Sequence, residues 1–121
     1  MRKPAKTFTD LIVWQRAHEL VLAIYKTTES FPKHEIDGLV SQIRRASVSI
    51  AADIAEGFRK RTIADKAKIL NIAQGSLEEV LYYLILTEDL KYAEVDYHHS
   101  LLTEVSKLLD AYRNTILNSG S

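Results

Sequence analysis

Two groups of basic side chains have the types and the spacing to bind phosphate. Arg44 and Arg45 are adjacent, and Arg59, Lys60 and Arg61 follow near the far end of the same predicted helix. A guanidinium presents paired donors that fit a phosphate or a carboxylate equally well. Arg45, Arg59, Lys60 and Arg61 are therefore the candidate contacts to a nucleic acid. Two other interpretations stay open. In the first, Arg44 and Arg45 pair with carboxylates on a neighbouring helix or subunit. In the second, the triplet is a charged loop that only keeps the protein soluble.

Histidines and carboxylates near residue 98 have the types of metal ligands, but not the spacing. Adjacent side chains on a helix point about 100° apart, so His98 and His99 cannot hold one ion together. The Glu-x-x-His segments of a di-iron bundle do not occur. The chain also has no Cys, no Gly-x-Ser-x-Gly segment and no His-Glu-x-x-His segment. The sequence thus predicts no enzyme: no catalytic residues, no metal site and no cofactor.

Composition is typical of one globular domain. The chain has 121 residues, of which 46% are hydrophobic, and it carries 16 Lys+Arg against 16 Asp+Glu. A chain of this length can bury a core, and we treat residues 1–121 as a single domain. No apolar run approaches the roughly 18 residues of a membrane span, so we expect a cytoplasmic protein with no membrane contact. Because the chain has no net charge, we do not expect the protein to coat nucleic acid through its overall charge.

Charge is unevenly divided along the chain. Residues 1–61 contain 11 Lys+Arg and 7 Asp+Glu, and residues 62–121 contain 5 and 9, so the two halves have net charges of +4 and −4. Opposite charges of this kind favour contacts between the acidic face of one copy and the basic face of another. The sequence therefore allows pairing between subunits as well as binding to a polyanion.

The elements that must position these residues are helices. Leu, Ala, Glu, Lys and Ile recur with helical spacing, and strand-like alternation does not occur. Four long helices joined by short loops favour an all-α, antiparallel up-down-up-down four-helix bundle. Gly57 suits a left-handed end for the second helix, and Gly75 suits a close approach between helices. The predicted helices span 9–29, 35–57, 63–90 and 94–117.

Two of these helices have more apolar surface than a single bundle can bury. The helix over 35–57 has a regular stripe at intervals of three and four residues and also a second apolar side. The helix over 63–90 likewise has apolar residues on more than one face. An exposed apolar patch above a few hundred Å² usually marks an interface. We therefore predict a homo-oligomer. Its candidate interface residues are Arg44, Val48, Phe58, Ile72 and Tyr83.

Three segments resemble a known family of bacterial proteins. They read FTDLIVWQRAHEL, FPKHEIDGLVSQIRRASVSIAADIAEG and ILNIAQGSLEEVLYYL. Together they resemble the four-helix bundle proteins called intervening-sequence or S23-type proteins, which have been found encoded in insertions within large-subunit ribosomal RNA genes. The resemblance covers roughly residues 8–92 closely and the last helix by pattern only. It implies a bundle that assembles as a ring-like homopentamer and has no established catalytic activity.

A more distant resemblance links the chain to accessory proteins of diversity-generating retroelements, which are pentamers that bind nucleic acid and a reverse transcriptase. Asp53 stands where the family usually has Asn before Ile-Ala-Glu-Gly, and a carboxylate there disfavours a phosphate contact. The resulting hypothesis is a non-enzymatic homopentamer that binds RNA, or a nucleic-acid-processing protein, through its repeated basic loop. The alternative is a structural or protein–protein interaction assembly with no nucleic-acid role.

Overall fold

The secondary structure of the computed structural model, which describes residues 4–119, consists of helices. No strand occurs within this range, which confirms the all-α class for the described residues. None of the helices in this range has the length and apolar content to cross a membrane. The long helices are α1 (Ile12–Thr28), α2 (Ser41–Arg59), α3 (Ile63–Asp89) and α4 (Asp96–Asn118), and short helical turns span Phe8–Asp10, Lys33–Glu35 and Ile36–Val40.

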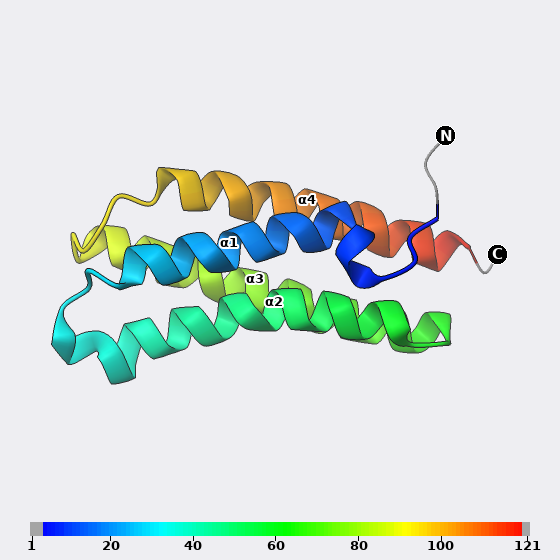
Figure 1. Cartoon of the computed structure of the whole chain (residues 1–121), viewed down its shortest axis with the longest axis horizontal. Coiled ribbons are helices and arrows are strands. Elements are labelled where there is room, and N and C mark those ends of the chain that lie inside the picture. The colour runs from blue at the N-terminus through cyan, green and yellow to red at the C-terminus, as the bar shows by residue number, and fades with distance from the viewer. Residues whose placement is uncertain (1–3, 120–121) are drawn as a thin grey trace.

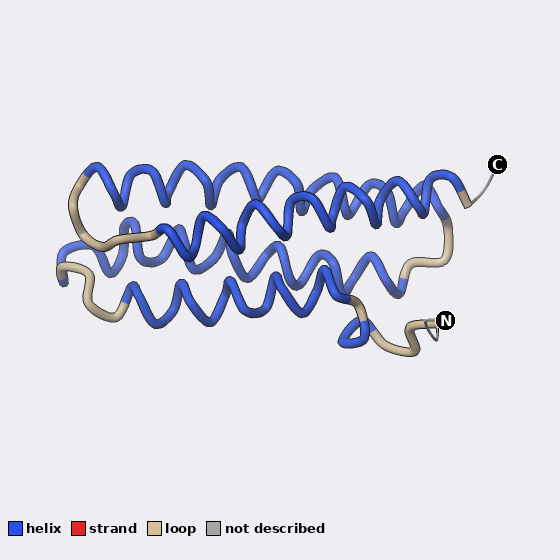
Figure 2. Tube along the Cα trace, turned by 90° about the horizontal axis from the view of Figure 1, so that it is seen from above, coloured by secondary structure: helices blue, strands red, loops and turns tan. Residues whose placement is uncertain are grey.

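The four long helices lie side by side along one axis, and the chain reverses direction at each connection (Figure 1). α1 contacts α2 and α4, and α3 contacts the same two helices, so the four surround a shared core. The α2–α3 connection lies at one end, and the other two connections lie at the opposite end (Figure 2). The two ends of the bundle therefore carry different connections.

The core is formed by one apolar stripe from each helix. The stripe predicted for the second helix is buried, with Ile50 and Ile54 completely excluded from solvent. Burying a Leu or Ile side chain contributes about 1.5–3 kcal/mol, so these stripes are the main source of stability. Further core residues from the other helices are Leu20, Ile24, Leu70, Leu84, Val105 and Leu109.

The first helix begins later than the prediction of residue 9. The turn at Phe8–Asp10 is a separate 3-10 helix, and Leu11 after it is extended, with φ −77° and ψ 127°. The Asp10 carboxylate accepts hydrogen bonds from the backbone N–H groups of Lys6 at 2.9 Å and Thr7 at 3.1 Å. These bonds hold the pKa of Asp10 below its ordinary value. Asp10 thus closes the turn and does not begin α1.

The second helix is regular only from Ser41, not from the predicted residue 35. A π-helical turn at Ile36–Val40 precedes it, and Gly38 within that turn has non-helical angles, φ −107° and ψ −111°. A Cβ added at Gly38 would lie 2.9 Å from Oε1 of Glu35. The backbone turns here around the Glu35 side chain, which interrupts the helix that the apolar spacing predicts.

The role predicted for Gly57 is wrong, and no close approach occurs at Gly75 within residues 4–119 of the chain. No described glycine has a positive φ, and α2 continues through Gly57 to Arg59. Gly57 is instead the site of close approach, because an added Cβ would lie 3.3 Å from Cδ2 of Leu70 on α3. A Cβ added at Gly75 would meet no atom within 4 Å. Gly57 faces α3 across the core, whereas Gly75 faces outward.

Candidate nucleic-acid interface

The basic triplet lies at the connection between α2 and α3. α2 ends at Arg59, and Lys60 after it has an extended backbone, with φ −64° and ψ 147°. The Thr62 hydroxyl accepts a hydrogen bond from the Asp65 backbone N–H at 3.1 Å, and this cap begins α3. The helix end and the cap leave only a short connection, so the triplet is confined to one tip of the bundle.

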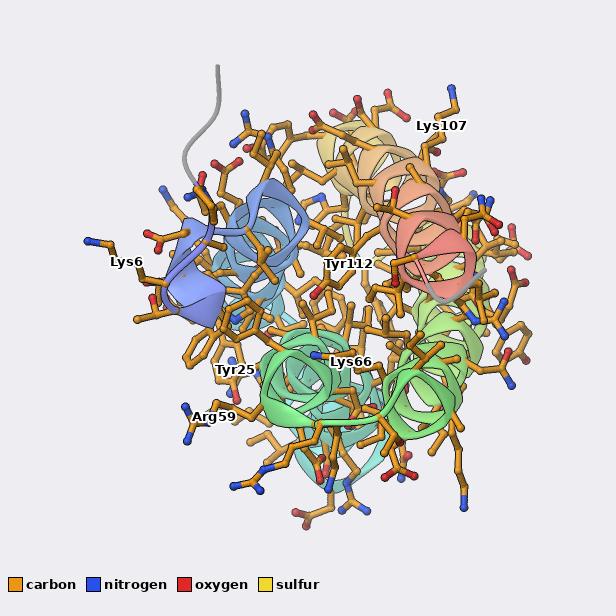
Figure 3. The ribbon with its side chains drawn as sticks, turned by 90° about the vertical axis from the view of Figure 1, so that its right-hand side faces the viewer. Lys6, Tyr25, Arg59, Lys66, Lys107 and Tyr112 are labelled. Atoms are coloured by element: carbon orange, nitrogen blue, oxygen red, sulfur yellow. The ribbon has the colours of Figure 1, made fainter. Side chains whose placement is uncertain are left out.

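Two guanidinium groups at this tip are free. The side chains of Arg59 and Arg61 are exposed, and no hydrogen bond or ion pair joins either of them to another residue within 4–119. The Lys60 ammonium lies 3.8 Å from the Glu56 carboxylate in an exposed ion pair, which contributes little to stability. Arg59 projects away from the bundle in the end view (Figure 3). Both arginines can therefore reach an anion without breaking an internal contact.

Lys66 adds no free charge to this tip. Its ammonium donates hydrogen bonds to the backbone oxygens of Phe58 at 2.8 Å and Gly57 at 3.2 Å. It also lies 5.7 Å from the centroid of the Phe58 ring. A cation is stabilised at the carbonyl end of a helix dipole, so Lys66 terminates α2. The Phe58 ring is half-buried and lies beside this ammonium group.

The N-terminal segment brings one more lysine to the same end. Lys6 is exposed and points outward beside α1 (Figure 3). Arg113 of α4 is half-buried, and its Nε donates to the Ala67 carbonyl oxygen at 3.4 Å. The exposed cations at this end of the described chain therefore come from Lys6, the triplet and Lys68 near the start of α3. Arg113 holds α4 to α3.

The two arginines at the start of α2 have different surroundings. Arg44 Nε donates to Thr28 Oγ1 at 2.9 Å, its terminal nitrogen donates to the Tyr25 carbonyl oxygen at 3.2 Å, and its guanidinium lies 4.5 Å from the Tyr25 ring centroid. Arg44 thus ties α2 to the end of α1. Arg45 is exposed and has no hydrogen bond or ion pair with the rest of the described chain.

The structure does not bring Arg45 together with the triplet. Fourteen residues separate Arg45 from Arg59 along α2, which corresponds to about 21 Å at the helical rise. Asp53 lies between them, half-buried, and its pKa is raised by burial and then by the charge of Glu56. One short anion could not contact both arginines. Of the four candidate contacts to nucleic acid, Arg59, Lys60 and Arg61 form one site, and Arg45 forms another.

The candidate interface residues differ in how much of their surface is exposed. Val48 on α2 exposes 41% of its surface and Ile72 on α3 exposes 53%. Tyr83 is half-buried against the core. Val48 and Ile72 are therefore the two apolar members of the predicted set that stay exposed.

One surface feature escaped the sequence analysis. Phe8, Trp14 and His18 line a hollow of about 270 Å³ between α1 and α2, whose other wall is formed by Val48 and alanines of α2. The Trp14 and His18 rings are stacked, with centroids 5.0 Å apart, and Phe8 meets Trp14 edge-on at 5.1 Å. The four-residue spacing of Trp14 and His18 could have signalled the stack. The place of Phe8 depends on the 3-10 turn.

The histidine pair does not form a metal site. His98 is buried, and its Nε2 lies 2.8 Å from Thr27 Oγ1 and 3.2 Å from the Ala23 carbonyl oxygen. The neighbouring His99 lies 3.9 Å from a carboxylate oxygen of Glu88. Residues 4–119 contain no group of three His, Cys, Asp or Glu residues placed to hold a metal ion. His98 therefore joins α4 to α1 as a hydrogen-bonding core residue.

Fold and surface together define a helical bundle protein with a basic tip. The chain belongs to the family of 23S rRNA-intervening sequence proteins, whose sequence profile matches residues 9–112. A solved structure of a protein of unknown function from the S23 ribosomal protein family of Bacteroides thetaiotaomicron VPI-5482 is 26% identical, with a TM-score of 0.75. The match covers 85% of this chain and 96% of that one. No curated protein matches the chain. The predicted family is thus confirmed, and the link to retroelement accessory proteins stays a prediction.

Proposed function

We propose that this chain is a non-enzymatic up-down-up-down bundle that self-associates in the cytoplasm as a homopentamer and binds RNA through its repeated basic tips. The observation that carries the proposal is the pair of exposed guanidinium groups, Arg59 and Arg61, which have no ion-pair partner within residues 4–119. The family's description as 23S rRNA-intervening sequence proteins supports RNA as the polyanion. Arginine forks also fit phosphate oxygens better than single ammonium groups do.

Repetition of the tip is a necessary part of this proposal. The whole chain is neutral, so a single copy offers RNA only a few cations. Several weak contacts that belong to one particle bind a long polyanion far more tightly than one contact does. Affinity is then expected to depend strongly on salt, because each neutralised phosphate releases bound counterions.

A salt series with RNA tests the proposal. Binding of the full chain to a single-stranded RNA is measured by fluorescence anisotropy from low to physiological salt, first for the wild type and then for Arg59→Ala/Arg61→Ala. The slope of log affinity against log salt should fall by about 1.4 for each subunit in contact, because two phosphate contacts are lost.

The matched control is Lys26→Ala/Lys33→Ala, which removes two exposed cations from the last turn of α1 and from the α1–α2 connection. This connection lies at the end of the bundle opposite the α2–α3 connection (Figure 1). Its slope should stay that of the wild type. Absence of binding at low salt, or an equal change in both variants, would contradict the proposal.

A second candidate function is an assembly that binds only protein, including a nucleic-acid-processing protein. It is favoured by the exposure of Val48 and Ile72, which a partner could cover. Under this alternative the wild type forms a stable oligomer but shows no salt-dependent binding to RNA. The same salt series therefore separates the two functions.

A further inference from the structure

The outer side of α2 presents a small residue beside the aromatic hollow. Ala52 is exposed and forms part of the hollow's wall with Val48. A side chain as short as that of alanine lets another helix approach closely. Arg45 stands seven residues before Ala52, so both lie on one face of α2, two turns apart. This face therefore offers an apolar depression and, beyond it, an unpaired cation.

The outer side of α3 presents the complementary pair. Ile72 projects with 53% of its surface exposed. Glu79, seven residues later, is exposed and forms no hydrogen bond or ion pair within the described chain. These two residues also share one helix face, two turns apart. This face therefore offers an apolar projection and, beyond it, an unpaired anion.

The order of the two features is opposite on the two helices. Arg45 precedes Ala52 on α2, whereas Ile72 precedes Glu79 on α3. Two helices packed antiparallel would therefore bring Ile72 to Ala52 and Glu79 to Arg45 at the same time, each pair about 10.5 Å from the other along the axes. Within one chain, no ion pair joins Arg45 to Glu79 among the described residues. A second copy of the chain could therefore form both contacts.

We propose that α3 of a second copy docks antiparallel on the face of α2 beside the aromatic hollow, with Ile72 against Ala52 and Glu79 paired with Arg45. This inference rests on the proposed self-association and names its contact surfaces. α2 and α3 already run in opposite directions within the bundle (Figure 1), so the two copies point the same way. Each copy then contacts one neighbour through its α2 face and another neighbour through its α3 face. Such head-to-tail contacts close into a ring when the rotation between neighbouring copies allows it.

The proposal also gives Arg45 a role separate from that of the basic tip. Arg45 lies about 21 Å along α2 from Arg59, in agreement with two distinct sites. The contact pairs the positive half of one copy with the negative half of the next, as the uneven charge of the sequence allows.

A charge exchange tests this contact. The full-length wild type, Arg45→Glu, Glu79→Arg and the combined Arg45→Glu/Glu79→Arg are compared by sedimentation velocity over a range of concentrations. Each single reversal places like charges opposite each other, so self-association should weaken by roughly tenfold or more. The combined variant restores opposite charges and should recover the wild-type assembly. Circular dichroism reports whether each variant keeps its helices.

Lys107→Glu is the control, because Lys107 is exposed on α4 and has no ion pair within residues 4–119. It should assemble as the wild type does. A wild type that stays monomeric overturns both the proposed self-association and this contact. An oligomer that survives both single reversals, or a combined variant that fails to recover, overturns only the contact. Failure of the RNA titration leaves this test unaffected.

Discussion

At the scale of single residues, His98 shows how surroundings set charge. Its pKa is lowered, first by burial and also by the nearby His99, although the hydrogen bond to Ala23 acts in the opposite direction. Nδ1 is buried and has no hydrogen-bond partner among the described residues. A second proton on the ring would therefore find no acceptor there. The neutral imidazole is the form that the fold accommodates.

Acid should consequently destabilise the protein through His98. Because the folded pKa lies below the unfolded value of about 6.5, the contribution of neutral His98 to stability is complete above that value. It declines as the pH falls toward the lower folded pKa. Urea unfolding at about pH 7.5 and about pH 5.5 measures this loss in the free energy of unfolding.

His98→Gln is the informative comparison, because glutamine keeps a polar N–H group and cannot take up a proton. The difference in stability between the two pH values should shrink in this variant. Both proteins share every other ionisable side chain, so the comparison isolates the contribution of His98. An unchanged difference would show that His98 is not the sensitive group.

At the scale of elements, the Glu35 carboxylate joins the α1–α2 connection to the α3–α4 connection at the end opposite the basic tip. The Tyr92 hydroxyl donates to Glu35 Oε2 at 2.8 Å, and the Leu39 backbone N–H donates to Oε1 at 3.3 Å. The Phe31 and Tyr92 rings also meet, with centroids 5.3 Å apart. The hydrogen bond from Tyr92, and then that from Leu39, lower the pKa of Glu35. The π-helical turn before α2 is thus held by the α3–α4 connection.

Removing this hydrogen bond should raise the pKa of Glu35. In Tyr92→Phe the carboxylate loses its largest stabilising contact, and a carbon-detected NMR titration of Glu35 should show a midpoint closer to the ordinary value of about 4.3. A depressed pKa adds stability above the unfolded pKa, and this stability is lost as the pH falls. The variant should therefore lose more stability at neutral pH than in acid.

Tyr97→Phe provides the matching control. Tyr97 is exposed, and its hydroxyl has no hydrogen bond within the described part of the chain. Its removal should leave the titration of Glu35 where it is. An equal shift in both variants would mean that the hydroxyl of Tyr92 is not the cause.

At the scale of the whole molecule, the two proposals make one joint prediction. Glu79→Arg adds positive charge to every copy, which by simple electrostatics should tighten binding to RNA. If assembly through α2 and α3 is what repeats the basic tip, the same variant should instead bind a long RNA roughly 100-fold more weakly, because multivalency is lost. Anisotropy at one fixed salt concentration measures the change.

The combined Arg45→Glu/Glu79→Arg variant should regain most of that affinity together with its assembly. A short RNA that spans a single subunit serves as the control, because its binding should not depend on assembly. Tighter binding of the long RNA by Glu79→Arg would separate RNA recognition from self-association.

Several features could be predicted because they depend on neighbours along one helix. The three- and four-residue spacing fixed which side chains share a face, so the buried stripe of α2 with Ile50 and Ile54 was expected and is confirmed. The family segments were recognisable for the same reason, since they are local patterns. Arg59, Lys60 and Arg61 were also expected beside the end of the second helix, although α2 continues past Gly57 to Arg59.

The sequence by itself therefore determined the helical class, the core stripes and the family. Only the tertiary structure decided that Gly57 and not Gly75 is the point of close approach, that Arg44 binds α1 while Arg45 stays free, and that Phe8 joins Trp14 in a hollow. Spacing along a helix sets the direction of a side chain about its own axis. What that side chain meets depends on the angle and height at which the other helices pack, and these are set by the whole core.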